Sequence, residues 1–214
     1  SIEEFSVYSG DIADSVGDIA KKIQAPIIGV NDSKLTMPTV QEGFNIKFVG
    51  ADYEQVIGKD LTIYKPLVNT TVKVSFEISK GNEKAYTEEF VVNVPGRYAI
   101  EEGTNSKPIV IPEIREWVGH KDNFEINNSS RILIDPLYKD ELASVANTFS
   151  EDYKDITGKE ISILESNEPK SGDFYFTLNT QDLGLGKEGH LMTISDSVKI
   201  EAQDSVGSYW ATIS

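Results

Sequence analysis

The sequence predicts two domains of different class: an all-β sandwich with a short N-terminal helix, then an α+β domain with helices packed on one sheet. A chain of 214 residues is long enough for two domains, since most domains span about 100 to 150 residues. The apolar pattern has a period of two from Lys34 to Pro95, after one short helical segment, and mixes strand and helix periods afterwards. A polar, turn-rich stretch separates these halves. We expect the sandwich in residues 1–97, a linker in 98–107 and the α+β domain in 108–214.

A short helix is predicted near the start of the first domain, within "GDIADSVGDIAKKIQAP". Asp11 can cap its beginning, Lys21 and Lys22 suit the negative end of the helix dipole, and Pro26 follows its end. Five side chains share its apolar face: Ile12, Val16, Ile19, Ala20 and Ile23.

Four β-branched or aromatic runs then predict the strands of the sandwich: "FNIKFVG", "LTIYKP", "TTVKVSFEIS" and "TEEFVVNVP". In the third run, the side chains expected to face the core are Val72, Val74, Phe76 and Ile78. The intervening "SKGNEKA" indicates a hairpin connection. Short alternating strands at this spacing are typical of a small β-sandwich.

The second domain begins with a buried strand in "RILIDPLY", and Asp135 and Pro136 supply a helix cap and first turn. The helix that follows is expected to end at Gly158, and its apolar stripe comprises Leu142, Val145, Phe149, Tyr153 and Ile156. Four strands come next, in "EISILE", "DFYFTLN", "GHLMTIS" and "VKIEAQ".

The last eleven letters, "DSVGSYWATIS", predict a second helix, with an apolar stripe formed by Val206, Tyr209, Trp210 and Ile213. No capping glycine follows this stripe. We therefore expect that the native chain continues beyond Ser214 and that the continuation covers the aromatic side chains.

Composition excludes several classes of function. The formal charge of −15 and the isoelectric point near 4.5 argue against a nucleic-acid partner, which needs a basic surface. The absence of cysteine excludes a disulfide framework, a thiolate zinc site and a cysteine nucleophile. No apolar run approaches the roughly 20 residues that span a bilayer, so no membrane-spanning segment is expected.

The motif "GLGKEG" places Gly184, Gly186 and Gly189 at the spacing of a dinucleotide-binding loop. That loop requires a helix after the last glycine, because the helix N-terminus holds the pyrophosphate. Here the following "HLMTIS" is a predicted strand. We therefore interpret the motif as a glycine-rich hairpin loop and expect no cofactor.

No other residue pattern marks a catalytic or metal site. His120 and His190 lie far apart and neither has a second ligand at helical or hairpin spacing. No G-x-S-x-G element occurs. With 35 acidic residues, close carboxylate pairs arise by chance, as do matches to the glycosylation pattern. The pairs are Glu113 with Glu116 and Glu151 with Asp152, and the glycosylation matches are at Asn69 and Asn128. We expect no catalytic, cofactor-binding or metal-binding residue in this chain.

The second half resembles the non-catalytic α+β domain that precedes the barrel in glycoside hydrolase family 20, the β-N-acetylhexosaminidases. The resemblance covers roughly residues 108–214 and rests on the order of elements from "SSRILIDPLYKDELASVANTFSEDYKDITGKEISILE" onward. Three short motifs match those of the family: Glu188-Gly189-His190, Ile200-Glu201-Ala202 and Gly207-Ser208-Tyr209-Trp210-Ala211-Thr212. His190 stands where the family usually has Tyr, and Ala211 where Gly is commoner.

The first half, with "ADYEQVIGKDLTIYKPLVNTTVKVSFEIS", resembles the atypical Ig-like domain found ahead of such enzymes in bacteria. Together the resemblances imply the N-terminal, non-catalytic part of a secreted or cell-surface bacterial β-N-acetylhexosaminidase. Its partner would be its own C-terminal (β/α)8 barrel, which in the family carries an adjacent Asp-Glu pair and acts on the glycan substrate. No residue of this chain matches that pair in its context, so we expect the chain alone to be inactive.

Two alternatives remain open. One is the equivalent region of a hyaluronidase or O-GlcNAcase-type glycosidase. The other is a surface adhesion or carbohydrate-binding module, which would need exposed aromatics beside polar groups. Trp117 and Trp210 are the two tryptophans of the chain, and a core or interdomain role explains both more simply.

Overall fold

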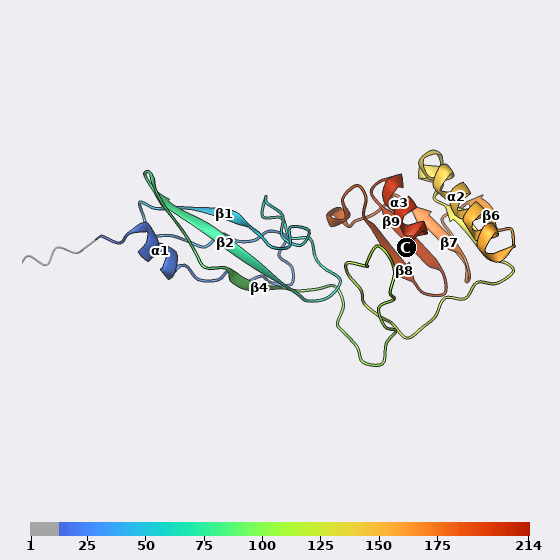
Figure 1. The fold of residues 1–214 in the computed structure, drawn as a ribbon, viewed down its shortest axis with the longest axis horizontal. Helices are drawn as coiled ribbons and strands as arrows, with labels where there is room; N and C mark the ends of the chain where they lie inside the picture. Colours follow the sequence, from blue (N-terminus) through green and yellow to red (C-terminus); the bar gives the residue numbers. More distant parts are fainter. Residues whose placement is uncertain (1–12) are drawn as a thin grey trace, which may run out of the picture. The chain divides into compact units, whose positions relative to one another are not determined.

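The computed structural model describes residues 13–214, which divide into two compact units (Figure 1). The first unit runs up to Lys65 and includes Asn69–Pro95; the second consists of Pro66–Val68 and Gly96–Ser214. The short segment at Pro66 belongs to the second unit because its carbonyl groups accept hydrogen bonds from Arg97 and Tyr98, at 3.0 and 2.8 Å. Residues 98–107, expected to be a linker, lie in the second unit.

The first unit opens with helix α1, Val16–Lys22. Ser15 caps it: the Ser15 side chain accepts from the Asp18 N–H, and the Asp18 carboxylate accepts from the Ser15 N–H. The expected cap at Asp11 and the apolar residue Ile12 lie outside the described residues. Val16, Ile19 and Ala20 are buried, as the sequence predicts.

One antiparallel sheet follows, built around a long central strand. Its strands are β1 (Asn45–Ala51), β2 (Thr70–Lys80), β3 (Glu83–Tyr86) and β4 (Phe90–Val94). Strand β1 pairs with one edge of β2, while β3 and β4 pair with the two ends of its other edge. The predicted alternation in β2 is confirmed, since four side chains are at most 1% exposed: Val72, Val74, Phe76 and Ile78.

The two-sheet Ig-like sandwich expected for residues 1–97 is not confirmed, because the named strands in the described part of the first unit form one sheet. The strand expected at residues 61–66 is reduced to isolated bridges, Lys34 with Thr62 and Ile57 with Ile63. Leu61 has a φ of 69°, outside the strand region, and Pro66 has no N–H to donate to a ladder. Helix α1 and these irregular segments cover the apolar face of the sheet.

The second unit contains a mixed five-stranded sheet in the order β6-β5-β7-β9-β8. Its strands are β5 (Arg131–Ile134), β6 (Ser162–Glu165), β7 (Phe174–Thr177), β8 (His190–Ile194) and β9 (Val198–Ala202). Neighbouring strands are parallel except β8 and β9, which form an antiparallel hairpin. The predicted order of strand, helix, four strands and helix is confirmed.

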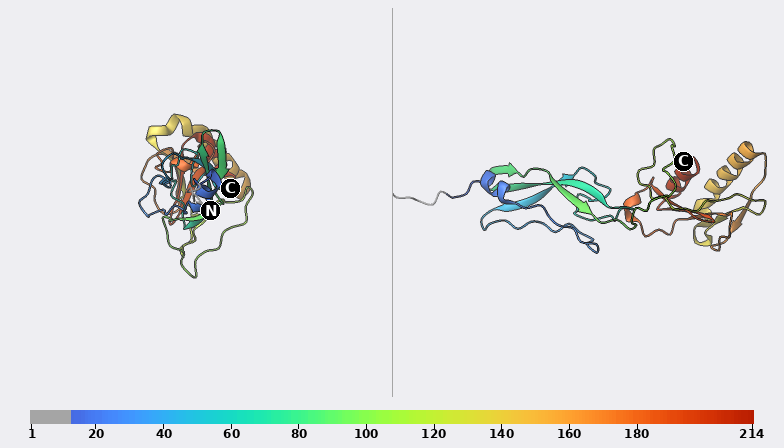
Figure 2. Two further views of the ribbon diagram at one scale, coloured as in Figure 1. Left: turned by 90° about the vertical axis from the view of Figure 1, so that its left-hand side faces the viewer. Right: turned by 90° about the horizontal axis from the view of Figure 1, so that it is seen from below.

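Two α-helices lie on the same face of this sheet (Figures 1 and 2). They are α2 (Lys139–Thr157), which follows the 3-10 turn Pro136–Tyr138, and α3 (Ser205–Thr212). Helix α2 ends at Gly158, whose φ of 71° suits glycine in the left-handed region. The predicted burial of Ile156 is wrong: its side chain is 84% exposed, because the core cluster ends at Tyr153 on this helix. No helix within residues 13–214 is long and apolar enough to cross a membrane.

Candidate functional site

Helix α3 packs on the sheet through its small residues, and its large apolar side chains face away. Gly207, Ser208 and Ala211 are buried. Tyr209, Trp210 and Ile213 are 40%, 38% and 43% exposed, and the two aromatic rings meet edge to face at 5.7 Å. The apolar stripe read from the sequence is therefore the outer surface of this helix. We call these three exposed side chains the α3 apolar patch.

The inner face of α3 is close to the sheet because two glycines meet there. A Cβ atom on Gly207 would overlap the carbonyl oxygen of Gly189, the residue before β8. A Cβ atom on Gly189 would in turn overlap the carbonyl oxygen of Leu185. The last glycine of "GLGKEG" thus allows three backbone segments to pack together, and β8 follows it as predicted.

The loop that carries this motif is fixed from both sides by Asp182. Its carboxylate accepts the Gly184 N–H at 3.2 Å and pairs with the Arg97 guanidinium at 2.8 Å. Its carbonyl oxygen accepts from the side chain of Gln203 at 3.1 Å. Helix α3 starts directly afterwards, capped by Asp204, whose side chain accepts from the Val206 N–H at 3.0 Å. The position of the α3 apolar patch is therefore set by hydrogen bonds as well as by packing.

A shallow groove of about 270 Å³ runs beside the patch, between α2 and α3. From α2 it is lined by Glu141, Ser144, Val145 and Thr148, and from α3 by Ser205, Val206 and Tyr209. Patch and groove share Tyr209, so the apolar patch lies beside a groove of mixed polar and apolar lining.

Beneath the helices, the end of β5 carries a buried polar network. The Asp135 carboxylate, 6% exposed, accepts from the hydroxyls of Thr177 at 2.7 Å and Tyr175 at 3.2 Å, and from the Leu137 N–H at 3.0 Å. Burial alone would raise the pKa of Asp135, but these hydrogen bonds outweigh it and hold the pKa below its ordinary value. Burial raises the pKa of Tyr175. The Asp135 carboxylate is therefore held in its charged form by these hydrogen bonds and is unsuited to act as an acid.

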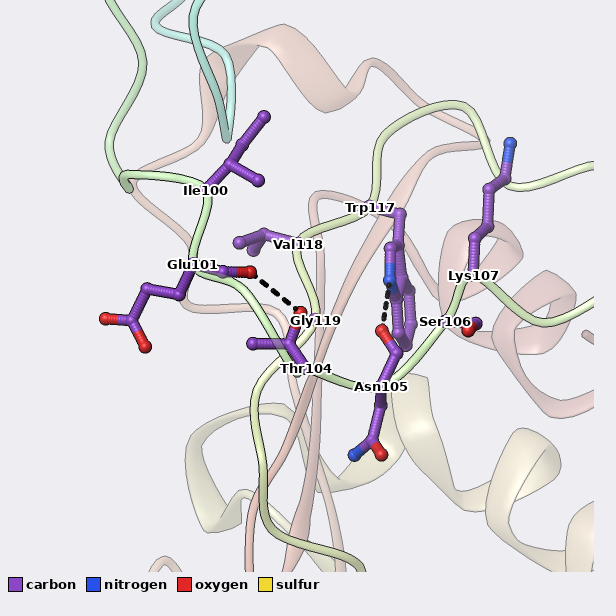
Figure 3. A pocket seen from close by; sticks show the side chains of 9 residues that line it. All are labelled: Ile100, Glu101, Thr104, Asn105, Ser106, Lys107, Trp117, Val118 and Gly119. Carbon is purple, nitrogen blue, oxygen red and sulfur yellow. Dashed lines mark hydrogen bonds between the residues drawn. The ribbon is translucent and has the colours of Figure 1, made fainter.

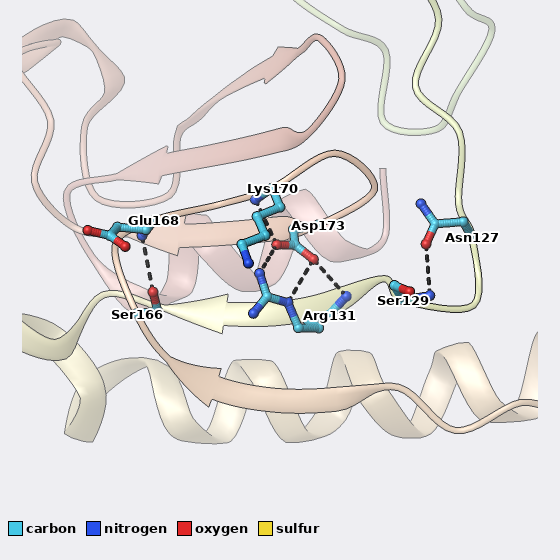
Figure 4. Close-up of polar contacts among 7 residues, drawn as sticks. All are labelled: Asn127, Ser129, Arg131, Ser166, Glu168, Lys170 and Asp173. Atoms are coloured by element: carbon cyan, nitrogen blue, oxygen red, sulfur yellow. Dashed lines mark hydrogen bonds and ion pairs between the residues drawn. The ribbon is translucent and has the colours of Figure 1, made fainter.

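A second buried carboxylate joins the start of β5 to β7 (Figure 4). Asp173, 1% exposed, accepts from the backbone N–H and the Nε of Arg131 at 3.0 and 3.2 Å, and from the Lys170 N–H at 2.8 Å. Burial would raise the pKa of Asp173, but the bonds from Arg131 and Lys170 lower it. Both buried carboxylates thus stabilise the sheet that positions α3.

The two histidines do not meet. His190 is half-buried on β8, and burial lowers its pKa. His120 is exposed and its ring lies edge-on to Tyr98. Within the part of the chain that the structure describes, no three His, Cys, Asp or Glu side chains are grouped so that they could hold a metal ion.

The carboxylate pairs proposed from the sequence have separate surroundings. Glu113 pairs with Lys107 at 2.8 Å, which lowers the pKa of Glu113, whereas Glu116 accepts from the Leu67 N–H at 3.2 Å. On α2, Glu151 is exposed and Asp152 half-buried. The glycosylation matches at Asn69 and Asn128 are both exposed.

Sequence reasoning missed both buried carboxylate networks, whose partners stand some 40 positions apart and meet only through parallel pairing of β5 and β7. A signal was present, because Asp173 and Thr177 flank the apolar run "FYF" where further apolar residues would be expected in a buried strand.

Residues 107–214 match the family model of glycosyl hydrolase family 20, domain 2. These are the residues that form the second sheet, both of its helices and the glycine loop. No curated protein matches the chain. The matched residues make up half of the chain and contain the whole second sheet with both of its helices. The chain therefore belongs to glycoside hydrolase family 20 and carries that family's domain 2.

Proposed function

We propose that this chain is the non-catalytic N-terminal region of a secreted β-N-acetylhexosaminidase, in which the second unit supports a (β/α)8 barrel and the first unit is a spacer. Domain 2 of family 20 is normally joined to the catalytic barrel. The barrel would remove terminal N-acetylhexosamines from glycans, and the residues described here would hold it in place.

The observation that carries this proposal is the α3 apolar patch. Tyr209, Trp210 and Ile213 are large apolar side chains on the outer face of a helix whose inner face is already packed. Apolar clusters of this kind are usually covered by another protein surface, since their exposure to water is unfavourable. The family match supplies the partner, because the barrel is what domain 2 is joined to.

The match to family 20 favours this parent over a hyaluronidase or O-GlcNAcase-type enzyme. An extracellular or cell-surface location and an Ig-like ancestry for the first unit rest on the sequence resemblance. Immunodetection of the protein in washed cells and culture medium tests the location, and a signal confined to the cytosol contradicts it.

Barrel support is tested on the chain joined to a family 20 barrel. Trp210→Ser should lower the thermal midpoint of the barrel, because the joined protein loses apolar contact at the interface. The matched control is Ile27→Ser, which removes an 89% exposed apolar side chain from the first unit and should change nothing. Equal effects of the two substitutions would contradict the assignment of the patch as the barrel contact.

A further inference from the structure

Trp117 lines a pocket in the second unit that barrel support does not use (Figure 3). The pocket has a volume of about 270 Å³ and lies between residues 100–107 and 117–119. Its apolar wall comes from Ile100, Val118 and the indole of Trp117, and its polar groups come mainly from Thr104, Asn105 and Ser106. The pocket combines one large aromatic ring with several small hydrogen-bonding groups.

The indole is held in place before any ligand arrives. Its Nε1 donates to the carbonyl oxygen of Asn105 at 3.3 Å, and the Asn105 N–H donates to the His120 carbonyl at 2.9 Å. Gly119 permits this close approach, because a Cβ atom there would overlap the Asn105 carbonyl oxygen. The two walls of the pocket are thus bound to each other, which reduces the entropy lost on binding.

Residues that line the pocket retain hydrogen-bonding capacity. The Thr104 hydroxyl donates to the Glu101 carbonyl at 3.3 Å and can still accept. The Asn105 amide donates to the Asp122 carbonyl at 2.9 Å, which leaves its oxygen as an acceptor. Ser106 is exposed and lines the same pocket, so its hydroxyl is open to a ligand. The Lys107 ammonium is neutralised by Glu113 at 2.8 Å.

We infer that this pocket binds a neutral hexopyranose unit of a glycan. The C–H face of a pyranose packs on an aromatic ring while its hydroxyls bond to nearby oxygens and amides. The volume is close to the lower end of ligand pockets, about 300 Å³, which suits one sugar unit. The net charge of −15 and the paired lysine disfavour anionic sugars. This inference does not depend on the barrel.

The test uses the two indole N–H signals of the ¹⁵N-labelled chain, which arise from Trp117 and Trp210 and are assigned with Trp210→Phe. The ligands are the methyl β-glycosides of N-acetylglucosamine and galactose, with galacturonic acid as the anionic counterpart. Either neutral glycoside should shift the Trp117 signal at millimolar concentration and leave the Trp210 signal unchanged.

Two variants locate the site. Trp117→Ala removes the aromatic wall, and Ser106→Tyr fills the pocket from an exposed position while leaving Trp117 intact. Each should weaken glycoside binding at least about tenfold, the loss of about 1.4 kcal/mol expected for an aromatic contact. Trp210→Ala should bind as the parent chain does. An unchanged Trp210 signal in the first two variants reports an intact fold.

Three results would overturn the inference: no shift of the Trp117 signal with either neutral glycoside, tighter binding of galacturonic acid, or binding that survives both Trp117→Ala and Ser106→Tyr. None of them bears on barrel support, which is measured on a different surface and by a different signal.

Discussion

The backbone of Gly207 in α3 lies directly on the carbonyl oxygen of Gly189, one residue before β8. This contact brings α3 onto the hairpin of β8 and β9, and it turns Tyr209 and Trp210 outward. Two of the short motifs that resemble family 20 each contribute one of these glycines. The resemblance therefore has a physical origin in packing and needs no catalytic explanation.

Substituting Gly207 by Ala should destabilise the second unit. The new methyl group would overlap the Gly189 carbonyl, so α3 must move away from the sheet, at a cost of about 1 to 3 kcal/mol. Urea unfolding followed by tryptophan fluorescence gives the change in free energy. An effect below about 0.5 kcal/mol, the range of ordinary surface substitutions, would show that the two backbones are not in contact.

Its neighbour Ser208 is a matched control with the opposite expectation. The Ser208 hydroxyl is fully buried and finds no hydrogen-bond partner among the described residues. Ser208→Ala removes this unsatisfied group and should be neutral or stabilising by about 1 kcal/mol. Both substitutions place alanine at adjacent positions of one helix, but Gly207→Ala should lower the unfolding free energy whereas Ser208→Ala should leave it unchanged or raise it. Clear destabilisation by Ser208→Ala would mean that the hydroxyl has a partner after all.

Thr177→Val should weaken the second unit at neutral pH by about 1 to 2 kcal/mol, because the Asp135 carboxylate loses its 2.7 Å donor. The pKa of Asp135 is lowered in the folded chain, so its contribution is present above the unfolded pKa of about 3.9 and is lost as pH falls through the folded pKa. The cost of Thr177→Val should therefore shrink at acid pH. Denaturation at pH 7 and pH 2.5 checks this, with the exposed Thr193→Val as control. A cost independent of pH would contradict the assignment.

Asp173→Asn should cost about 3 kcal/mol, since it leaves the Arg131 guanidinium without its buried partner. The matched control is Glu160→Gln, which breaks the Lys154–Glu160 pair at 2.8 Å on the surface. That pair is well exposed and screened by water, so its loss should change the unfolding free energy far less. Equal losses in the two variants, measured by urea unfolding, would refute the claim that burial makes the first pair important.

His190 should make the second unit less stable at mildly acid pH. Its folded pKa is lowered by burial, so the unfolded chain binds a proton more readily, and stability falls as pH drops from about 6.5 toward the folded pKa. Replacement by Tyr, the residue that family members usually carry, removes this dependence. Thermal midpoints at pH 7.5 and pH 5.5 should differ less in His190→Tyr than in the parent chain. An unchanged difference would assign the acid sensitivity to other groups.

Local patterns predicted much of the second unit. The Asp135-Pro136 turn and the stop at Gly158 are correct, because caps and left-handed glycines act within a few residues. The strand order β6-β5-β7-β9-β8 was beyond prediction, since parallel pairing joins segments that are distant in sequence. The apolar stripe of α3 indicated correctly that its aromatic side chains need a covering surface. It did not show which residues face the sheet, because close backbone packing at Gly207 favours small residues there.

The first unit was harder to predict for a related reason. Alternation correctly marked β2, which is buried on one face from Val72 to Ile78. Alternation could not show that "LTIYKP" forms only isolated bridges and no strand. That outcome depends on the positive φ of Leu61 and on the geometry of the loops that face this segment. The cap at Ser15 did have a local signal, since Asp18 three residues later completes a capping box.

The most direct measurement of barrel support is release of the aryl group from an aryl N-acetyl-β-glucosaminide. It compares this chain with the same chain joined to a family 20 barrel, each shown by circular dichroism to be folded. We predict hydrolysis by the joined protein and none by the chain of residues 1–214 alone. Hydrolysis by the chain alone, or by neither folded protein, would contradict the account.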